Sequence, residues 1–173
     1  MEEKKRKLSD RLFPDYRLYD EVPFGFWYIG FFGFVLSFFN LAINLFSHLS
    51  LLLGFLTDTL YDVPKDPGAF DLIISGSFAL YYLVSGVLFF RLSVLYWNFR
   101  DEAAEKFRRL LMIDMGVFFL YNILYFIGLY LYKNHYLIPK LPLYIILSVV
   151  ALYYLFQNVE KGAKKTVARI DGK

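Results

Sequence analysis

Four long stretches almost free of charge dominate this sequence and most constrain how it can fold. They cover residues 24–57, 72–95, 110–132 and 141–158, and none contains more than one charged residue. A helix needs about 20 apolar residues to cross roughly 30 Å of hydrocarbon, and each stretch reaches or nearly reaches that length. Helices satisfy their backbone hydrogen bonds without neighbours, whereas barrel strands are shorter and alternate in polarity. The pattern therefore predicts four transmembrane helices.

The composition supports a chain that is embedded in lipid. Hydrophobic residues make up 58% of the 173 residues and charged residues only 20%, which is unusual for a water-soluble domain. Cysteine is absent, so disulfides, thiolate metal sites and thiol nucleophiles are excluded. We predict an all-α, polytopic membrane protein, a four-transmembrane-helix bundle with both termini in the cytoplasm.

The orientation follows from the distribution of lysine and arginine. Sixteen of the nineteen basic residues lie in the N-terminal segment, in the second connection or in the C-terminal tail, and the other two connections hold only Lys65, Lys133 and Lys140. Basic residues concentrate in cytoplasmic segments, which places both termini on that side. We expect an integral, multi-pass protein of the cell (plasma) membrane.

The boundaries of the parts follow from the same pattern. We expect a basic or interfacial cytoplasmic segment, one transmembrane domain and a basic cytoplasmic tail, over residues 1–23, 24–158 and 159–173. Within the domain, the flanking polar residues set the four spans at about 24–57, 71–99, 107–133 and 140–158. The second connection contains neither glycine nor proline, so we expect helical extensions joined by a tight turn near residues 101–104.

The first span carries an unusual group of polar residues in its apolar sequence. At 100° per residue, one arc of about 100° contains all of them: Ser37, Asn40, Asn44, Ser47 and His48. Polar side chains in a membrane face other helices or a cavity rather than lipid. We therefore predict an intramembrane polar face here, which either bonds neighbouring helices together or lines a cavity.

The third span contributes a second set of polar residues. Tyr121 and Tyr125 share a face with Asp114, and Asn122 lies at the edge of that face. An unpaired charge inside a membrane is costly, and Arg91 lies at a similar depth in the second span. We therefore predict a buried ion pair between Arg91 and Asp114.

His48 is a candidate for titration, proton relay or metal binding, because imidazole is versatile near neutral pH. The sequence offers it no second histidine, cysteine or paired carboxylate at ligand spacing, so we expect no metal and no cofactor. Asp114 lies near the cytoplasmic end of its span and His48 in the outer half of its own. We therefore expect no direct pairing between these two residues.

Three classes of function remain open. The first is a structural or accessory subunit that packs against partner chains in a membrane assembly. The second is a small oligomeric transporter or channel with a polar path along Asn40, Asn44 and His48. The third is an intramembrane lipid-binding protein or lipid-modifying enzyme, although no catalytic signature occurs in the sequence.

The expected partners follow from composition and charge. They are the lipid bilayer, further copies of the chain or other membrane subunits, and anionic lipid headgroups at the cytoplasmic face, where basic residues cluster. The net charge is only +3 and orientation already accounts for the basic residues, so we expect no binding to nucleic acid.

Overall fold

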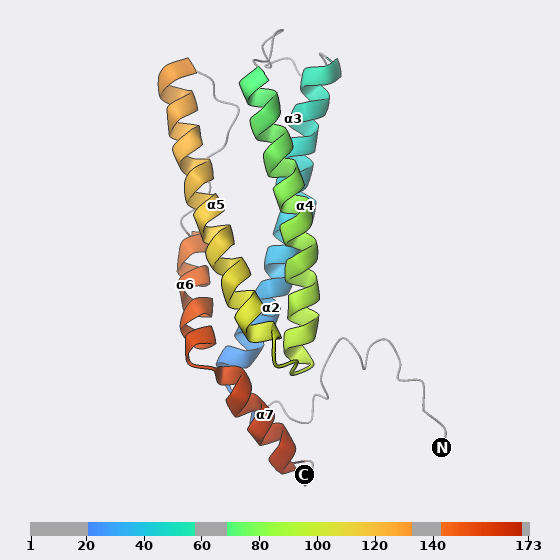
Figure 1. Ribbon diagram of the computed structural model, residues 1–173, viewed down its shortest axis with the longest axis vertical. Helices are drawn as coiled ribbons and strands as arrows, with labels where there is room; N and C mark the ends of the chain where they lie inside the picture. The colour runs from blue at the N-terminus through green and yellow to red at the C-terminus, as the bar shows by residue number, and fades with distance from the viewer. Residues whose placement is uncertain (1–20, 58–68, 133–142, 171–173) are drawn as a thin grey trace, which may run out of the picture. The chain divides into compact units, whose positions relative to one another are not determined.

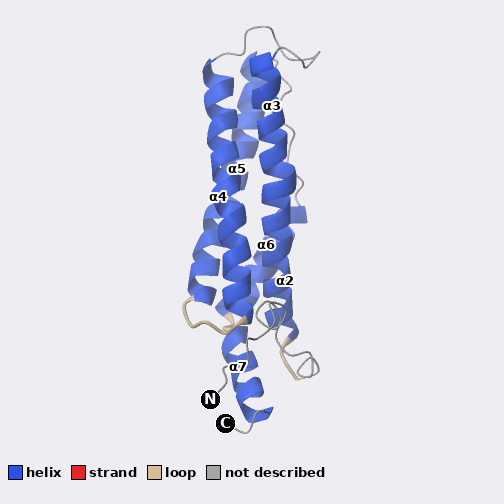
Figure 2. Ribbon diagram, turned by 90° about the vertical axis from the view of Figure 1, so that its right-hand side faces the viewer, coloured by secondary structure: helices blue, strands red, loops and turns tan. Residues whose placement is uncertain are grey.

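A computed structural model describes residues 21–57, 69–132 and 143–170 of this chain. Every regular element in these ranges is helical and none is a strand, as Figure 2 shows. The prediction of an all-helical fold is thereby confirmed for the part of the chain that the structure describes. The segment expected at 1–23 lies mostly outside it.

The helices follow the apolar stretches closely. Their bounds are α2 Phe24–Phe38, η2 Phe39–Asn44, α3 Leu45–Thr57, α4 Ala69–Trp97, α5 Ala103–Tyr132, α6 Leu143–Phe156 and α7 Val159–Ile170. Among the described residues, three helices are long and apolar enough to cross a membrane, namely Phe24–Gly54, Leu72–Trp97 and Ala103–Ile127. The count rises to four if α6 and α7, which meet at a 57° bend, form one span.

The chain divides into two compact units. Unit one takes its described residues from Met1–Phe34, Phe89–Ile113 and Pro142–Lys173, and unit two takes them from Val35–Leu88 and Asp114–Leu141. Helices α2, α4 and α5 each contribute residues to both units. The two units are described separately below.

In unit one, glycines on α2 allow its neighbours to approach closely. A Cβ atom on Gly25 would lie 2.4 Å from the Tyr154 ring of α6, and one on Gly30 would lie 1.6 Å from Nε1 of Trp97 on α4. At Gly33 the same atom would lie 2.0 Å from a side-chain oxygen of α4. Small residues let helix backbones pack tightly in membranes. The first half of span one is therefore shaped to receive aromatic side chains.

Aromatic rings form much of the remaining packing in unit one. The Phe26 ring is fully buried and stacks on Tyr96 and Phe99, with centroids 5.0 and 4.9 Å away. The Tyr28 hydroxyl donates to the backbone oxygen of Leu147 on α6, at 2.9 Å. Stacked rings contribute about 0.5–1.5 kcal/mol beyond the area that they bury.

The α4–α5 connection begins at Phe99, which has a left-handed backbone with φ of 54°. The Arg100 amide donates to the Leu95 carbonyl at 3.1 Å, and the Phe99 amide donates to the Tyr96 carbonyl at 3.0 Å. These two bonds form a Schellman cap, which usually has glycine at the left-handed position. The expected tight turn exists, but α4 ends at Trp97, two residues earlier than predicted, because this cap ends the helix.

Helix α7 follows a second left-handed residue, Asn158, whose φ is 52°. Asparagine tolerates this conformation better than most residues, and here the chain turns by 57° between α6 and α7 (Figure 1). The buried Ala163 fixes which side of α7 faces the rest of unit one. The tail predicted over 159–173 therefore contains a helix, which the sequence analysis did not anticipate.

A half-buried acid lies at the start of α7. One carboxylate oxygen of Glu160 is buried without a hydrogen bond to any described residue. The Tyr96 hydroxyl, which interacts electrostatically with Glu160, is buried in the same way. Burial raises the pKa of the Glu160 carboxyl above its ordinary value of 4.5, and the nearby Lys161 and Arg108 only partly oppose this. Folding therefore favours the protonated acid.

This pKa shift predicts that Glu160→Gln stabilises the protein at neutral pH. A raised folded-state pKa gives full stability below the unfolded-state pKa of about 4.5, and that stability is lost as pH rises through the folded-state value. Thermal unfolding in detergent should show that the melting temperature of the parent chain falls between pH 4 and pH 8. The fall should be smaller in Glu160→Gln. Glu102→Gln is the control, because Lys106 lowers the pKa of that exposed acid. A variant less stable than the parent at pH 7.5 would contradict the prediction.

In unit two, the first span contains a π-helical turn, η2. The Leu45 amide donates to the Asn40 carbonyl five residues earlier, so this turn holds one residue more than an α-helical turn. Residues after it are rotated by about 100° relative to an unbroken α-helix. This rotation turns Ser47 to the exposed side, whereas His48 stays buried. Ser47 is therefore not buried with Ser37, Asn40 and His48, and its place on the polar face stays a prediction.

Candidate functional site

The polar side chains of span one meet α4 inside unit two. The Ser37 hydroxyl donates to the Gly86 carbonyl at 2.8 Å, and the Asn40 amide nitrogen donates to the Ser85 hydroxyl oxygen at 3.1 Å. The Asn44 amide nitrogen donates in turn to the Asn40 amide oxygen at 3.0 Å. We call these five residues the amide cluster. Asn40 is its centre, since it both donates and accepts.

The contact between the two helices depends on a glycine. A Cβ atom on Gly86 would lie 2.6 Å from the Leu41 side chain and 3.4 Å from the Cβ atom of Asn40. Because Gly86 has no Cβ atom, the α4 backbone comes close enough for the Gly86 carbonyl to accept a hydrogen bond from the Ser37 hydroxyl. Interhelical hydrogen bonds of this kind contribute about 0.6–2 kcal/mol in membranes.

His48 lies among three aromatic rings. Only 3% of it is exposed, and its ring stacks on Phe78 and Tyr82 with centroids 5.5 and 5.6 Å away. The Tyr121 ring meets it edge-on at 5.8 Å. We call Phe78, Tyr82 and Tyr121 the aromatic cage of His48. Two of its rings stack on the imidazole and the third, Tyr121, a predicted site residue, meets it edge-on.

Asp114 is held by a tyrosine of α4. The Tyr81 hydroxyl donates to the Asp114 carboxylate at 2.6 Å, and only 6% of Asp114 is exposed. The carboxylate also interacts electrostatically with Tyr82, which stacks on His48. The sequence analysis expected no direct pairing of Asp114 and His48. The structure adds that Tyr82 stacks on His48 and interacts electrostatically with Asp114.

The predicted pairing of Arg91 with Asp114 remains a prediction. Arg91 is exposed and belongs to unit one, whereas Asp114 is buried in unit two. Within unit two, the Tyr81 hydroxyl supplies a hydrogen bond to the carboxylate that the sequence analysis did not consider.

The other predicted residues of α5 lie at the edge of this site. The Asn122 amide nitrogen donates to the Phe118 carbonyl of its own helix at 2.8 Å, and the half-buried Tyr125 packs edge-on against Phe126. Neither contact joins two helices.

Sequence reasoning missed two hydrogen-bond partners on α4, Tyr81 and Ser85. They are four residues apart and so share a helix face. That spacing of two hydroxyls was the available signal, but the adjacent apolar residues obscured it.

The described residues contain no group of three or more histidine, aspartate or glutamate side chains that could hold a metal ion. The interactions seen at this site are hydrogen bonds of amides and hydroxyls, ring stacking on the His48 imidazole, and a hydrogen bond from the Tyr81 hydroxyl to the Asp114 carboxylate.

No known protein family, no curated protein and no solved structure matches this chain. Its class has to follow from its own residues. Three of the described helices are long and apolar enough to cross a bilayer, and polar side chains of span one form hydrogen bonds with α4 inside unit two. The chain is an all-helical integral membrane protein.

Proposed function

We propose that this chain is a structural or accessory subunit of a membrane assembly, with no catalytic role of its own. One observation carries the proposal: the donors of the amide cluster are used in hydrogen bonds inside the protein, and two of the three bonds join span one to α4. Ser37, Asn40 and Asn44 each donate to another residue of the same cluster, rather than presenting those donors to a substrate. Such groups stabilise the packing of helices in lipid.

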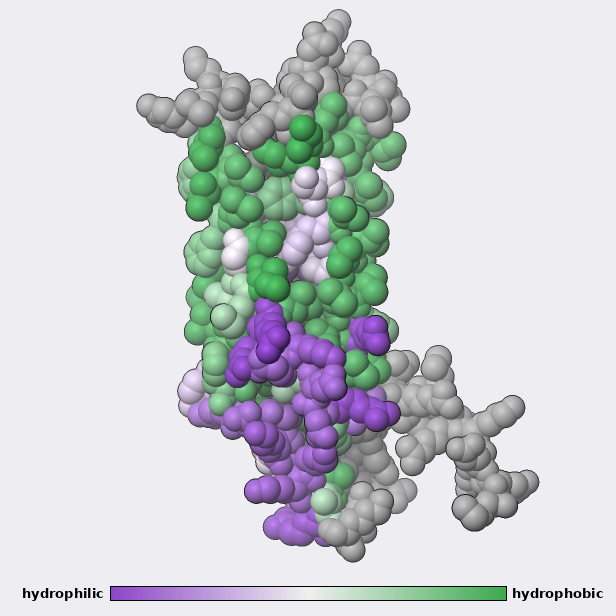
Figure 3. All heavy atoms as spheres, viewed as in Figure 1, coloured by the Kyte–Doolittle hydropathy of each residue, from purple (hydrophilic) through white to green (hydrophobic). Residues whose placement is uncertain are grey.

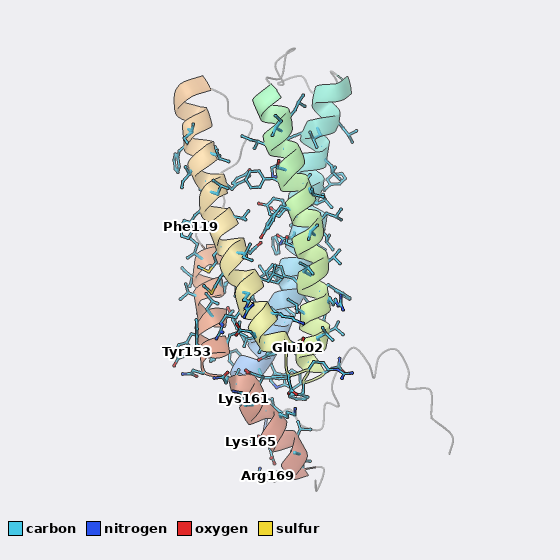
Figure 4. The ribbon with its side chains drawn as sticks, in the orientation of Figure 1. Glu102, Phe119, Tyr153, Lys161, Lys165 and Arg169 are labelled. Atoms are coloured by element: carbon cyan, nitrogen blue, oxygen red, sulfur yellow. The ribbon has the colours of Figure 1, made fainter. Side chains whose placement is uncertain are left out.

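The outer surface is consistent with this role. Large aromatic side chains project from several helices, among them Phe31, Phe46, Phe119 and Phe126, each at least half exposed. Figure 4 shows Phe119 pointing outward from α5. Aromatic residues are enriched at protein interfaces because they contribute a large contact area at a small entropic cost.

The assembly is tested by purification from native membranes in mild detergent, followed by native mass spectrometry. We expect the chain in a fixed ratio with at least one other membrane subunit. A lone monomer under these conditions would overturn the proposal, and a homo-oligomer would favour a transporter instead.

The role of the amide cluster makes a separate prediction. Asn40→Ala should lower the free energy of unfolding by about 1–3 kcal/mol, because it removes two hydrogen bonds and leaves buried groups without partners. Thermal unfolding in detergent measures this effect. Asn98→Ala, at an exposed asparagine, is the matched control and should change little. An unchanged stability together with a lost ion flux would contradict a packing role.

A small proton-coupled transporter is the second candidate. It is favoured by the grouping of titratable side chains within unit two, all buried or half-buried. Tyr82 stacks on His48 and interacts electrostatically with Asp114, and Tyr81 donates a hydrogen bond to Asp114. Reconstituted vesicles with an internal pH dye would test it. Proton flux that Asp114→Asn abolishes would support transport, and no flux above protein-free vesicles would exclude it.

A further inference from the structure

Two lysines on α7, Lys161 and Lys165, are exposed and have no ion pair with any described acidic residue. Most of the other basic residues on α5 and α7 do form an ion pair. Lys164 pairs with Asp101 at 2.9 Å, and Arg169 pairs with Glu21 at 2.6 Å. Glu105 likewise holds two arginines of α5, and Glu102 holds Lys106.

The orientation of α7 explains why these two lysines are left over. Ala163 is fully buried, and a Cβ atom on Gly162 would lie 3.7 Å from the Pro23 ring. At 100° per residue, Lys161 and Lys165 point about 160° away from Ala163 on either side. The side of α7 opposite its contact with the rest of unit one thus carries two lysines one turn apart that form no ion pair with a described acidic residue.

These lysines lie close to the end of a membrane-embedded helix. Helix α7 is bent by 57° from α6, so each of its residues advances only about 0.8 Å along the direction of α6. Lys165 is then about 5 Å beyond Val159 along that direction. The headgroup layer is about 5–8 Å thick on each side of a bilayer, so with α6 along the bilayer normal both lysines lie within it.

The surroundings of the two lysines also suit a lipid headgroup. Tyr153 on α6 is 58% exposed and occupies the position of an interfacial aromatic anchor. Figure 4 shows Tyr153, Lys161 and Lys165 projecting to the same side of α6 and α7. Hydrophilic residues gather over α7 and the adjoining ends of α4 and α5, whereas apolar residues cover the helices beyond them (Figure 3).

We propose that Lys161 and Lys165 together bind the headgroup phosphate of an anionic phospholipid in the cytoplasmic leaflet. Two ammonium groups one turn apart can contact the same phosphate, and each basic residue near an anionic surface favours binding by about fivefold. This inference goes beyond the proposed function, because it needs no partner chain. It rests on the predicted cytoplasmic side of α7, where anionic lipids are enriched.

The test uses the complete chain, which has no cysteine of its own. A donor dye on Gln157→Cys is followed in phosphatidylcholine vesicles that contain one-fifth phosphatidylglycerol, with a trace of acceptor-labelled phosphatidylglycerol or acceptor-labelled phosphatidylcholine. We expect severalfold greater energy transfer to the anionic lipid at low salt. The ratio of energy transfer to the anionic lipid over transfer to phosphatidylcholine should fall to nearly one in Lys161→Gln/Lys165→Gln. In the parent chain this ratio should decrease at high salt.

The matched control is Lys164→Gln/Arg169→Gln, which removes the same charge from the same helix but at residues that already have acidic partners. We expect it to retain the lipid preference. Equal loss in both double variants would overturn the proposal in favour of nonspecific charge attraction, and so would equal transfer to both lipids in the parent chain. Helicity measured by circular dichroism checks that α7 is intact in each variant.

Discussion

Gly30→Ala is expected to destabilise the protein by about 1–3 kcal/mol or more. The added methyl group would lie 1.6 Å from Nε1 of Trp97, far inside any tolerable contact, and the Trp97 side chain is 93% buried. An indole in a packed interior cannot rotate away without disturbing its neighbours, so the helices themselves have to shift. Thermal unfolding in detergent, monitored by size-exclusion chromatography, measures the loss.

Two other glycines provide matched controls for this prediction. A Cβ atom on Gly76 or Gly116 meets no other atom within 4 Å. Gly76→Ala and Gly116→Ala should therefore leave stability unchanged or raise it slightly, since alanine favours helix. Gly30→Ala/Trp97→Phe should recover part of the loss by making room. Equal melting of Gly30→Ala and the parent chain would show that α2 and α4 do not pack as described.

Tyr81→Phe is expected to have the second large effect, lowering the free energy of unfolding by about 1.5–3 kcal/mol. The Tyr81 hydroxyl donates to the buried Asp114 carboxylate at 2.6 Å, and hydrogen bonds to charged groups are stronger than neutral ones. Removing the donor leaves a carboxylate in an apolar environment with one partner fewer. Thermal unfolding at neutral pH measures the cost.

A double-mutant cycle isolates this interaction. Asp114→Asn removes the charge but keeps an oxygen that can accept, so Tyr81→Phe should cost much less in that background. Tyr125→Phe removes a hydroxyl from a half-buried tyrosine of α5 and should have little effect. If Tyr81→Phe costs the same with and without the Asp114 charge, the hydrogen bond does not contribute.

Much of the fold could be predicted from the sequence because lipid imposes simple rules. Long uncharged stretches have to be helices, and the described helices start and end within a few residues of the expected limits in most cases. Two of the deviations follow from Phe99 and Asn158. Both adopt a left-handed backbone that the residue type alone does not reveal, since neither position is a glycine.

The candidate site was predictable only in part. A periodic pattern indicates which side of a helix is polar, so Ser37, Asn40 and His48 were identified as inward-facing residues, and the structure buries all three. The periodic pattern of one helix cannot indicate which residue of another helix faces each of these side chains. That depends on the relative height and rotation of both helices, which is why Ser85 and Tyr81 were not anticipated as partners.

The π-helical turn explains why Ser47 is exposed although a constant helical period groups it with buried residues. The same turn also determines where the sequence can lose a residue. A turn with one residue too many is an insertion that the helix has absorbed. Deleting a single residue from Phe39–Asn44 would convert the turn to regular α-helix and leave His48 facing the aromatic cage. Elsewhere in this span a deletion would turn every following side chain to a new face. Length variation is therefore tolerable at this turn and harmful on either side of it.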